Sequence, residues 1–131
     1  MGFITHSVDN GHVPTLEYLP CDAIQPKIGL AMTLSGGKLV TAAGTTKPTY
    51  ICMTERDDAV ASGDQIACFR ILPEMVFETT FSVAATSIKL GNKVTISGTG
   101  EQVTATTTDG VAEIVEMDGT AAGAKCRVRL A

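Results

Sequence analysis

The residues of this chain that could do chemistry are its cysteines and histidines. The cysteines stand at positions 21, 52, 68 and 126, and none forms a CxxC pair, which predicts free thiols in a reducing compartment. Cys52 and Cys68 lie between apolar neighbours, where a thiol behaves as a small hydrophobic group unless a base or a cation lowers its pKa. A base would have to be His6 or His12, and both lie in a segment expected to be mobile. The sequence therefore predicts no nucleophilic catalysis and no enzyme.

The metal-binding and cofactor-binding patterns are equally weak. His6, Asp9 and His12 could hold a divalent ion, but polar N-terminal segments often contain such residues, and no further ligand cluster lies nearby. The acidic residues between positions 57 and 64 lack the spacing of a calcium-binding loop. Neither GxxxxGK[ST] nor a GxGxxG between strand and helix occurs. We predict no metal site and no cofactor.

The composition is that of a globular domain with a modest negative charge. The chain has 131 residues, of which ten are basic and fourteen acidic, and its net charge is -4. Nucleic-acid binding relies on clustered lysine and arginine, and stacking sites rely on aromatic rings, which make up 5% of the chain with no tryptophan. The apolar stretches fall far short of the ~20 residues that a membrane helix needs, and the N-terminus lacks a secretory pattern. We expect neither nucleic acid nor a membrane as partner, and synthesis in a cytoplasm.

Hydrophobic periodicity divides the chain near residue 26. Residues 1–26 carry Pro14, Pro20 and Pro26 and little periodicity, which predicts an extended N-terminal arm. From Lys27 onward, short alternating runs are separated by Gly- and Asp-containing turns about every 8–12 residues. Residues 27–131 are therefore predicted to form a mainly β domain, a small barrel or sandwich, either as one unit or as two lobes at 27–72 and 75–131. Little helix is expected, at most a turn near 57–61 or a short piece near 111–117.

Strand-like alternation assigns faces to two of these runs. The run MVFETTFSV at 75–83 predicts one core face and one wet face; the core face holds Met75, Phe77, Phe81 and Val83, and the wet face Glu78, Thr80 and Ser82. The final run, KCRVRLA, places three cations on one face, and we call them the basic stripe: Lys125, Arg127 and Arg129. The stripe could dock against an acidic partner surface, or pair with Glu113 and Glu116 within the fold; internal pairing or a solvated face is the favoured interpretation.

The order of features in residues 29–53 resembles one known family. A stretch of the form G-x-A-M-T-L from Gly29 to Leu34 leads through a Gly36-Gly37 turn into KLVTA at 38–42, and Gly44-Thr45-Thr46 precedes an apolar run at 50–53. With the Pro-containing arm before it, this order resembles the head decoration proteins of tailed bacteriophages, including the lambda-type protein. The likeness covers residues 1–72. The C-terminal part is instead similar to the small SH3-like β barrels of phage structural proteins.

The resemblance implies a non-enzymatic capsid decoration protein that binds the outer surface of the expanded head and stabilises the shell. Its partner would be the major capsid protein, its location the capsid exterior of the virion, and its state a homo-oligomer (a trimer) or a monomer on the lattice. The candidate capsid-binding residues are the apolar residues of the arm and the basic stripe: Phe3, Ile4, Val13, Leu16, Tyr18, Leu19, Lys125, Arg127 and Arg129. The alternative is a phage tail or fibre accessory module that binds a cell-surface ligand, which the scarcity of aromatic residues disfavours.

Overall fold

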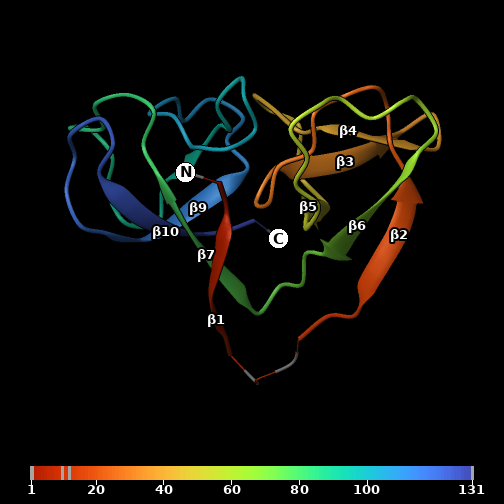
Figure 1. The fold of residues 1–131 in the computed structure, drawn as a ribbon. Coiled ribbons are helices and arrows are strands. Elements are labelled where there is room, and N and C mark those ends of the chain that lie inside the picture. Colours follow the sequence, from red (N-terminus) through yellow and green to blue (C-terminus); the bar gives the residue numbers. More distant parts are fainter. Residues whose placement is uncertain (1, 10, 12, 131) are drawn as a thin grey trace.

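The protein is built from β-strands, as a computed structural model describing residues 2–9, 11 and 13–130 shows (Figure 1). The strands in these residues are β1 (Ile4–Val8), β2 (Leu16–Pro20), β3 (Ala31–Ser35), β4 (Lys38–Thr41), β5 (Tyr50–Cys52), β6 (Gln65–Arg70), β7 (Met75–Thr80), β8 (Lys93–Val94), β9 (Ala112–Met117) and β10 (Lys125–Arg129). No helix occurs in the same residues. The predicted mainly β class is confirmed, and the segment 111–117, where a short helix was considered, contains strand β9 instead.

The described strands form two five-stranded antiparallel sheets that lie side by side (Figure 1). Sheet A has the order β1-β7-β10-β9-β8, and sheet B has the order β2-β6-β5-β3-β4. Each sheet ends in two edge strands, so neither closes into a barrel. Apart from β1 and β2, sheet B uses strands from the predicted lobe 27–72 and sheet A uses strands from the predicted lobe 75–131. We call residues 27–72 lobe B and residues 75–131 lobe A.

The N-terminal segment belongs to both sheets and does not form a separate arm. Strand β1 pairs with β7, with Ile4 opposite Glu78, and strand β2 pairs with β6, with Leu16 opposite Phe69. The backbone is extended, as predicted, but the boundary at residue 26 is wrong, because each strand completes the edge of a sheet. Pro20 is the last residue of β2, and an edge strand is where a sheet tolerates proline.

The hairpin that carries the family resemblance forms as predicted. Strands β3 and β4 pair with Ser35 opposite Lys38, so Gly36 and Gly37 alone make the turn. Both glycines have positive φ angles, 59° and 82°, as a two-residue hairpin turn of type I′ requires.

Two hydrophobic cores meet at sheet B. One face of β5 places Tyr50 and Cys52 in the core of lobe B, while the other face places Ile51 in the core shared with lobe A. The shared core also holds Phe69 of β6 and Phe77 of β7, whose rings stack with their centroids 6.2 Å apart. The lobes are therefore joined by packing as well as by the chain.

The face assignment for 75–83 holds only in part. Met75 and Phe77 of β7 are buried, as predicted. Thr80 is buried as well, although we assigned it to the wet face, and Val83 is 47% exposed, although we assigned it to the core. Val83 lies beyond the end of β7 at Thr80, so the alternation does not reach it. Thr80 is buried because β7 is covered on both faces, as the burial of its neighbour Val76 on the same face shows.

Candidate functional site

An uncharged groove lies between the lobes, and we call it the central groove. It consists of two hollows of about 280 Å³ and about 210 Å³. The larger hollow is lined by Thr5, Val8, Val13, Pro14, Leu16, Met53, Phe69 and Met75. The smaller hollow is lined by Phe3, Ile4, Thr5, Ile28, Met53 and Phe69. The hollows adjoin, because Thr5, Met53 and Phe69 line both of them.

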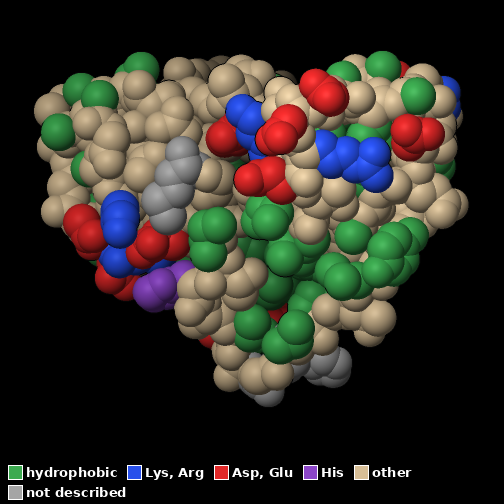
Figure 2. Space-filling view, in the orientation of Figure 1, with side chains coloured by type: hydrophobic (Ala, Val, Ile, Leu, Met, Phe, Trp, Pro, Cys, Tyr) green, Lys and Arg blue, Asp and Glu red, His purple; other side chains and the backbone are tan. Residues whose placement is uncertain are grey.

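The walls of the central groove come from both lobes. Strand β1 supplies one wall, and β2 and β6 supply the other through Leu16 and Phe69. Met53 follows the last residue of β5, and Met75 opens β7. In Figure 1, β1 and β2 flank the connection from β6 to β7, and Figure 2 shows hydrophobic side chains gathered over this region below a group of charged ones.

Exposed apolar side chains concentrate at this groove. Nine large hydrophobic residues are exposed in the described part of the chain, and five of them line the groove: Ile4 (45%), Val13 (77%), Leu16 (46%), Ile28 (46%) and Met53 (40%). Single exposed hydrophobic residues are common on protein surfaces, whereas a contiguous group is typical of a binding surface.

The apolar surface continues along sheet B. In the pairing of β2 with β6, Leu16 lies opposite Phe69 and Tyr18 lies opposite Ala67, so these four share one face of the sheet. Lobe A covers this face at Phe69, which is 8% exposed, but Tyr18 remains 63% exposed. The uncovered part of the face thus extends the groove toward Tyr18.

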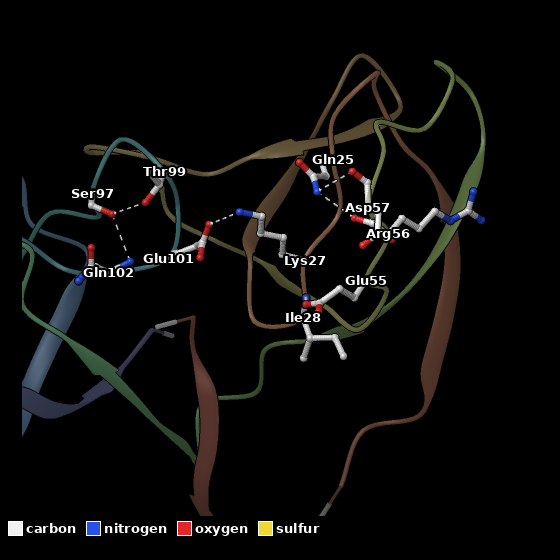
Figure 3. Close-up of polar contacts among 10 residues, drawn as sticks. All are labelled: Gln25, Lys27, Ile28, Glu55, Arg56, Asp57, Ser97, Thr99, Glu101 and Gln102. Atoms are coloured by element: carbon white, nitrogen blue, oxygen red, sulfur yellow. Dashed lines mark hydrogen bonds and ion pairs between the residues drawn. The ribbon is translucent and has the colours of Figure 1, made fainter.

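Polar contacts fix the segment that carries Ile28 at the rim of the groove (Figure 3). The side-chain amide of Gln25 donates to the carbonyl oxygens of Arg56 and Asp57 at 3.0 and 3.1 Å. The backbone N–H of Ile28 donates to a carboxylate oxygen of Glu55 at 3.3 Å. These bonds tie residues 25–28 to the loop after β5, so Ile28 and Met53 keep their places on the same side of the groove.

A second set of contacts joins the rim to lobe A. Lys27 forms an ion pair with Glu101 at 3.8 Å (Figure 3). The loop that bears Glu101 is held by Ser97, whose hydroxyl accepts from the backbone N–H of Gln102 at 3.2 Å and bonds the hydroxyl of Thr99 at 3.1 Å. The ion pair is half-exposed and contributes little by itself.

The start of β1 is anchored by a close approach of two backbone segments. Phe3 donates its N–H to the carbonyl of Gly29 at 2.8 Å, and Gly29 donates its own to the carbonyl of Cys52 at 2.9 Å. Gly29 has a φ of 91°, and a Cβ there would lie 2.9 Å from the Phe3 nitrogen. Only glycine fits this position without strain, and the contact sets β1 against lobe B.

The structure brings some of the predicted arm residues together at the groove. Ile4, Val13 and Leu16 line it, and Tyr18 is exposed beside it. Leu19 lies on the opposite face of β2, half-buried against the core of lobe B. Phe3 lines the smaller hollow but is 1% exposed and part of the shared core, so its prediction as a surface anchor is wrong.

The basic stripe lies on one face of β10, as predicted, and two of its cations are paired within the fold. Arg127 forms ion pairs with three carboxylates: Glu78 at 2.9 Å, Glu116 at 3.2 Å, and Asp118. Hydrogen bonding to Asp118 is the main cause that raises the pKa of Arg127. Arg129 pairs with Asp9 at 3.3 Å and donates to the carbonyl of Pro73 at 3.2 Å. The predicted pairing with Glu116 is confirmed for Arg127. Glu113, the other predicted partner, lies opposite Arg129 in the sheet. Lys125, the third cation of the stripe, is exposed.

The four cysteines are free and buried. Burial raises the pKa of Cys21 and Cys68 to about 11 and that of Cys126 to about 12, and it also raises the pKa of Cys52. Since the thiolate is the nucleophile, these environments oppose covalent catalysis.

The histidines and acidic residues give no metal centre in the described part of the chain. Within it, no group of three or more His, Cys, Asp and Glu side chains is placed to hold a metal ion. His6 lies on β1, and His12, the other histidine of the proposed pair, lies outside the described residues.

Sequence reasoning missed seven of the eleven residues that line the groove. Ile28 and Met53 had no predicted role, and Met75 was assigned to the core, because no local pattern shows that these residues meet β1. The one available signal was the apolar run at 50–53, which ends with Met53 directly before a polar segment.

Searches for related proteins found no matching family model and no matching curated protein. Among the described residues, no helix is both long and apolar enough to span a membrane.

Proposed function

We propose that this protein is a phage capsid decoration protein that binds the major capsid protein on the outer surface of the expanded head and stabilises the shell without catalysis. The observation that carries the proposal is the central groove: an uncharged, apolar hollow, built from both lobes and rimmed by half-exposed side chains. Such a surface suits contact with another protein, whose apolar groups would displace water from it.

The hairpin adds support for this class of protein. Residues 29–53 carry the resemblance to phage decoration proteins, and they supply β3, β4 and β5 of lobe B as well as Met53 of the groove. The resembling segment therefore contributes Met53 to the wall that lobe B supplies to the groove.

The buried thiols and the paired arginines point the same way. A nucleophilic site needs an accessible thiolate, which burial opposes at each of the four cysteines. A phosphate-binding surface needs unpaired cations, whereas Arg127 and Arg129 are engaged with carboxylates. Of these three kinds of site, a surface that binds through apolar contact is the one that the exposed side chains support.

Sugar binding, as in a tail or fibre module, is less well supported. Five of the six aromatic side chains are buried, and Tyr18, at 63% exposure, is the remaining ring. Sugar-binding sites usually stack the sugar rings on aromatic side chains and bind their hydroxyls with polar groups of the pocket. The central groove, in contrast, has an apolar lining.

The stability of undecorated shells tests the proposal. Expanded capsids that lack decoration, from the phage that encodes this chain, would be heated with and without the purified protein. We expect the protein to raise the temperature at which the shells disassemble, in proportion to the occupied sites. An unchanged temperature at saturating protein would contradict the proposal. Analytical ultracentrifugation of the free protein separates the trimer from the monomer.

A further inference from the structure

Two of the four buried cysteines lie directly opposite each other in sheet B. Cys52 is the last residue of β5, Cys68 lies in β6, and the antiparallel register of these strands pairs the two. Both side chains are fully buried and belong to the core of lobe B, so they lie on the same face of the sheet. This arrangement places two free thiols side by side.

The backbone hydrogen bonds show that the two side chains are close. Cys52 donates its N–H to the carbonyl of Leu30 at 2.9 Å and accepts the N–H of Gly29 at 2.9 Å, so its backbone groups point away from β6. Cys52 and Cys68 are therefore a non-hydrogen-bonded pair, the kind in which facing side chains lie closest. The Cα atoms of such a pair are about 4.5 Å apart, and disulfides span about 4.4–6.8 Å between Cα atoms. A disulfide can thus form here without separating the strands.

The other two cysteines lack an opposed thiol. Cys126 of β10 lies opposite Thr79 on one side and Met117 on the other. Cys21 follows β2 and bridges to Leu39 of β4. These two positions are therefore natural controls for the opposed pair.

Hydrogen bonds at the two sulfur atoms distinguish their reactivity. The Sγ atom of Cys52 donates to the carbonyl of Thr54 at 3.3 Å and accepts the N–H of Thr54 at 3.4 Å. Burial raises the pKa of Cys52, and the bond from Thr54 offsets part of this effect because it favours the thiolate. The Sγ atom of Cys68 donates to the carbonyl of Glu17 at 3.6 Å, and burial raises its pKa to about 11. Cys52 is therefore the better nucleophile of the pair.

We propose that Cys52 and Cys68 form an oxidation site, which a peroxide converts into a cross-strand disulfide in the folded protein. The Cys52 thiolate attacks one oxygen of hydrogen peroxide, the O–O bond breaks, hydroxide leaves, and Cys52 becomes a sulfenic acid. The Cys68 sulfur then attacks the Cys52 sulfur, loses its proton and displaces the hydroxyl group as water. In sum, two thiols lose two electrons and two protons, and one peroxide becomes two water molecules.

The disulfide would close the base of the connection from β5 to β6. This connection, residues 53–64, carries the groups that accept hydrogen bonds from Gln25 and Ile28 at the rim of the central groove. Met53 and Phe69 directly follow the two cysteines, and each lines both hollows of the groove. Oxidation would therefore fix the strands that carry this wall. The inference goes beyond the proposed function and does not depend on what the protein binds.

Peptide mapping of the full-length protein tests the pairing. The reduced, folded protein would be incubated overnight with millimolar hydrogen peroxide at pH 8, because a buried thiol reacts only during local openings of the fold. Remaining thiols would be blocked in denaturant, and trypsin would place Cys52 in peptide 39–56 and Cys68 in peptide 57–70. We expect these two peptides to be joined, and a reductant to separate them. Thiols that stay reduced, a bond from Cys52 to Cys21, or bonds between chains would overturn the inference.

Four cysteine variants separate the pair from the other thiols. Cys21→Ala and Cys126→Ala remove buried thiols outside the pair, and both should still form the disulfide. Cys68→Ala should stop at the Cys52 sulfenic acid, which dimedone labels. Cys52→Ala should give at least fivefold less dimedone label on Cys68. Equal labelling in these last two variants would contradict Cys52 as the attacking sulfur, and loss of the disulfide in Cys21→Ala would contradict the pairing.

The melting temperature tests the consequence for the fold. Oxidation should raise the melting temperature of the wild-type protein by at least about 5 °C, because the bond closes the loop of residues 52–68 in the unfolded chain. A reductant should reverse the rise, and the same treatment should not raise the melting temperature of Cys68→Ala. A linked wild-type protein without the rise, or an equal rise in Cys68→Ala, would overturn the inference that the bond fixes lobe B.

Discussion

Replacement of Phe3 by alanine tests whether the N-terminal strand is part of the folded core. Phe3 is 1% exposed within the shared core, and its N–H bonds to Gly29 of lobe B. Truncation of a buried phenylalanine to alanine typically costs about 3–5 kcal/mol of unfolding free energy, because the lost apolar contacts leave a cavity. A domain of this kind has about 5–15 kcal/mol in total, so the variant would lose a large share of its stability.

Ile4→Ala is the matched control for this experiment. Ile4 is the next residue along the chain and is 45% exposed, so about half of its side chain is buried. Full burial of an isoleucine contributes about 1.5–3 kcal/mol, and the control should therefore cost about half of that, roughly 0.8–1.5 kcal/mol. A clear gap between the two variants would distinguish core packing from a general effect of changes near the N-terminus.

Equilibrium unfolding in urea, followed by far-ultraviolet circular dichroism, measures both variants. We expect the midpoint to fall much further for Phe3→Ala than for Ile4→Ala, with similar slopes. A Phe3→Ala cost no larger than that of Ile4→Ala would refute the packing described for this segment. It would restore the separate N-terminal arm that the sequence predicted for residues 1–26.

Three further predictions concern a glycine, an ion-pair cluster and a thiol. Gly29→Ala should lower the free energy of unfolding in urea by at least about 1 kcal/mol more than Gly63→Ala. Both positions have a positive φ, which costs an alanine about 1–2 kcal/mol, but only at Gly29 would the new Cβ also clash with backbone atoms. Equal losses for the two variants would contradict the close approach. Arg127→Met should lower the melting temperature more than Arg129→Met, because it leaves three carboxylates together without their cation; the reverse order in calorimetry would contradict it. Cys68 should resist iodoacetamide at pH 8 until the protein unfolds, because burial raises the pKa of this thiol from 9.0 to about 11. Only the unfolded chain ionises between pH 9 and pH 11, so the folded protein should lose stability as the pH rises through this window. Rapid labelling of the native protein, or stability that rises with pH in this window, would contradict the burial.

Local patterns in the sequence were sufficient for part of the fold. The turn at Gly36-Gly37 and the alternation of buried and paired residues along β10 are properties of neighbouring residues, so both could be predicted. The internal pairing of Arg127 with Glu116 followed from the same alternation.

The placement of the N-terminal strands could not be predicted from local patterns. Ile4 pairs with Glu78 and Leu16 pairs with Phe69, and these partners are far away in the sequence. Prolines and the absence of clear alternation favoured an arm, although an edge strand tolerates both. The groove depends on those pairings, so Ile4 and Leu16 were predicted as contact residues while Ile28 and Met53 on the facing wall were not.

Co-sedimentation of the wild-type protein with expanded, undecorated capsids tests the proposed decoration role most directly. The capsids would come from the phage that encodes the chain, and the protein would be added over a wide concentration range. The account predicts saturable binding at a fixed ratio to capsid subunits. Folded protein that stays in the supernatant at every concentration, with shells that remain intact and expanded, would contradict it.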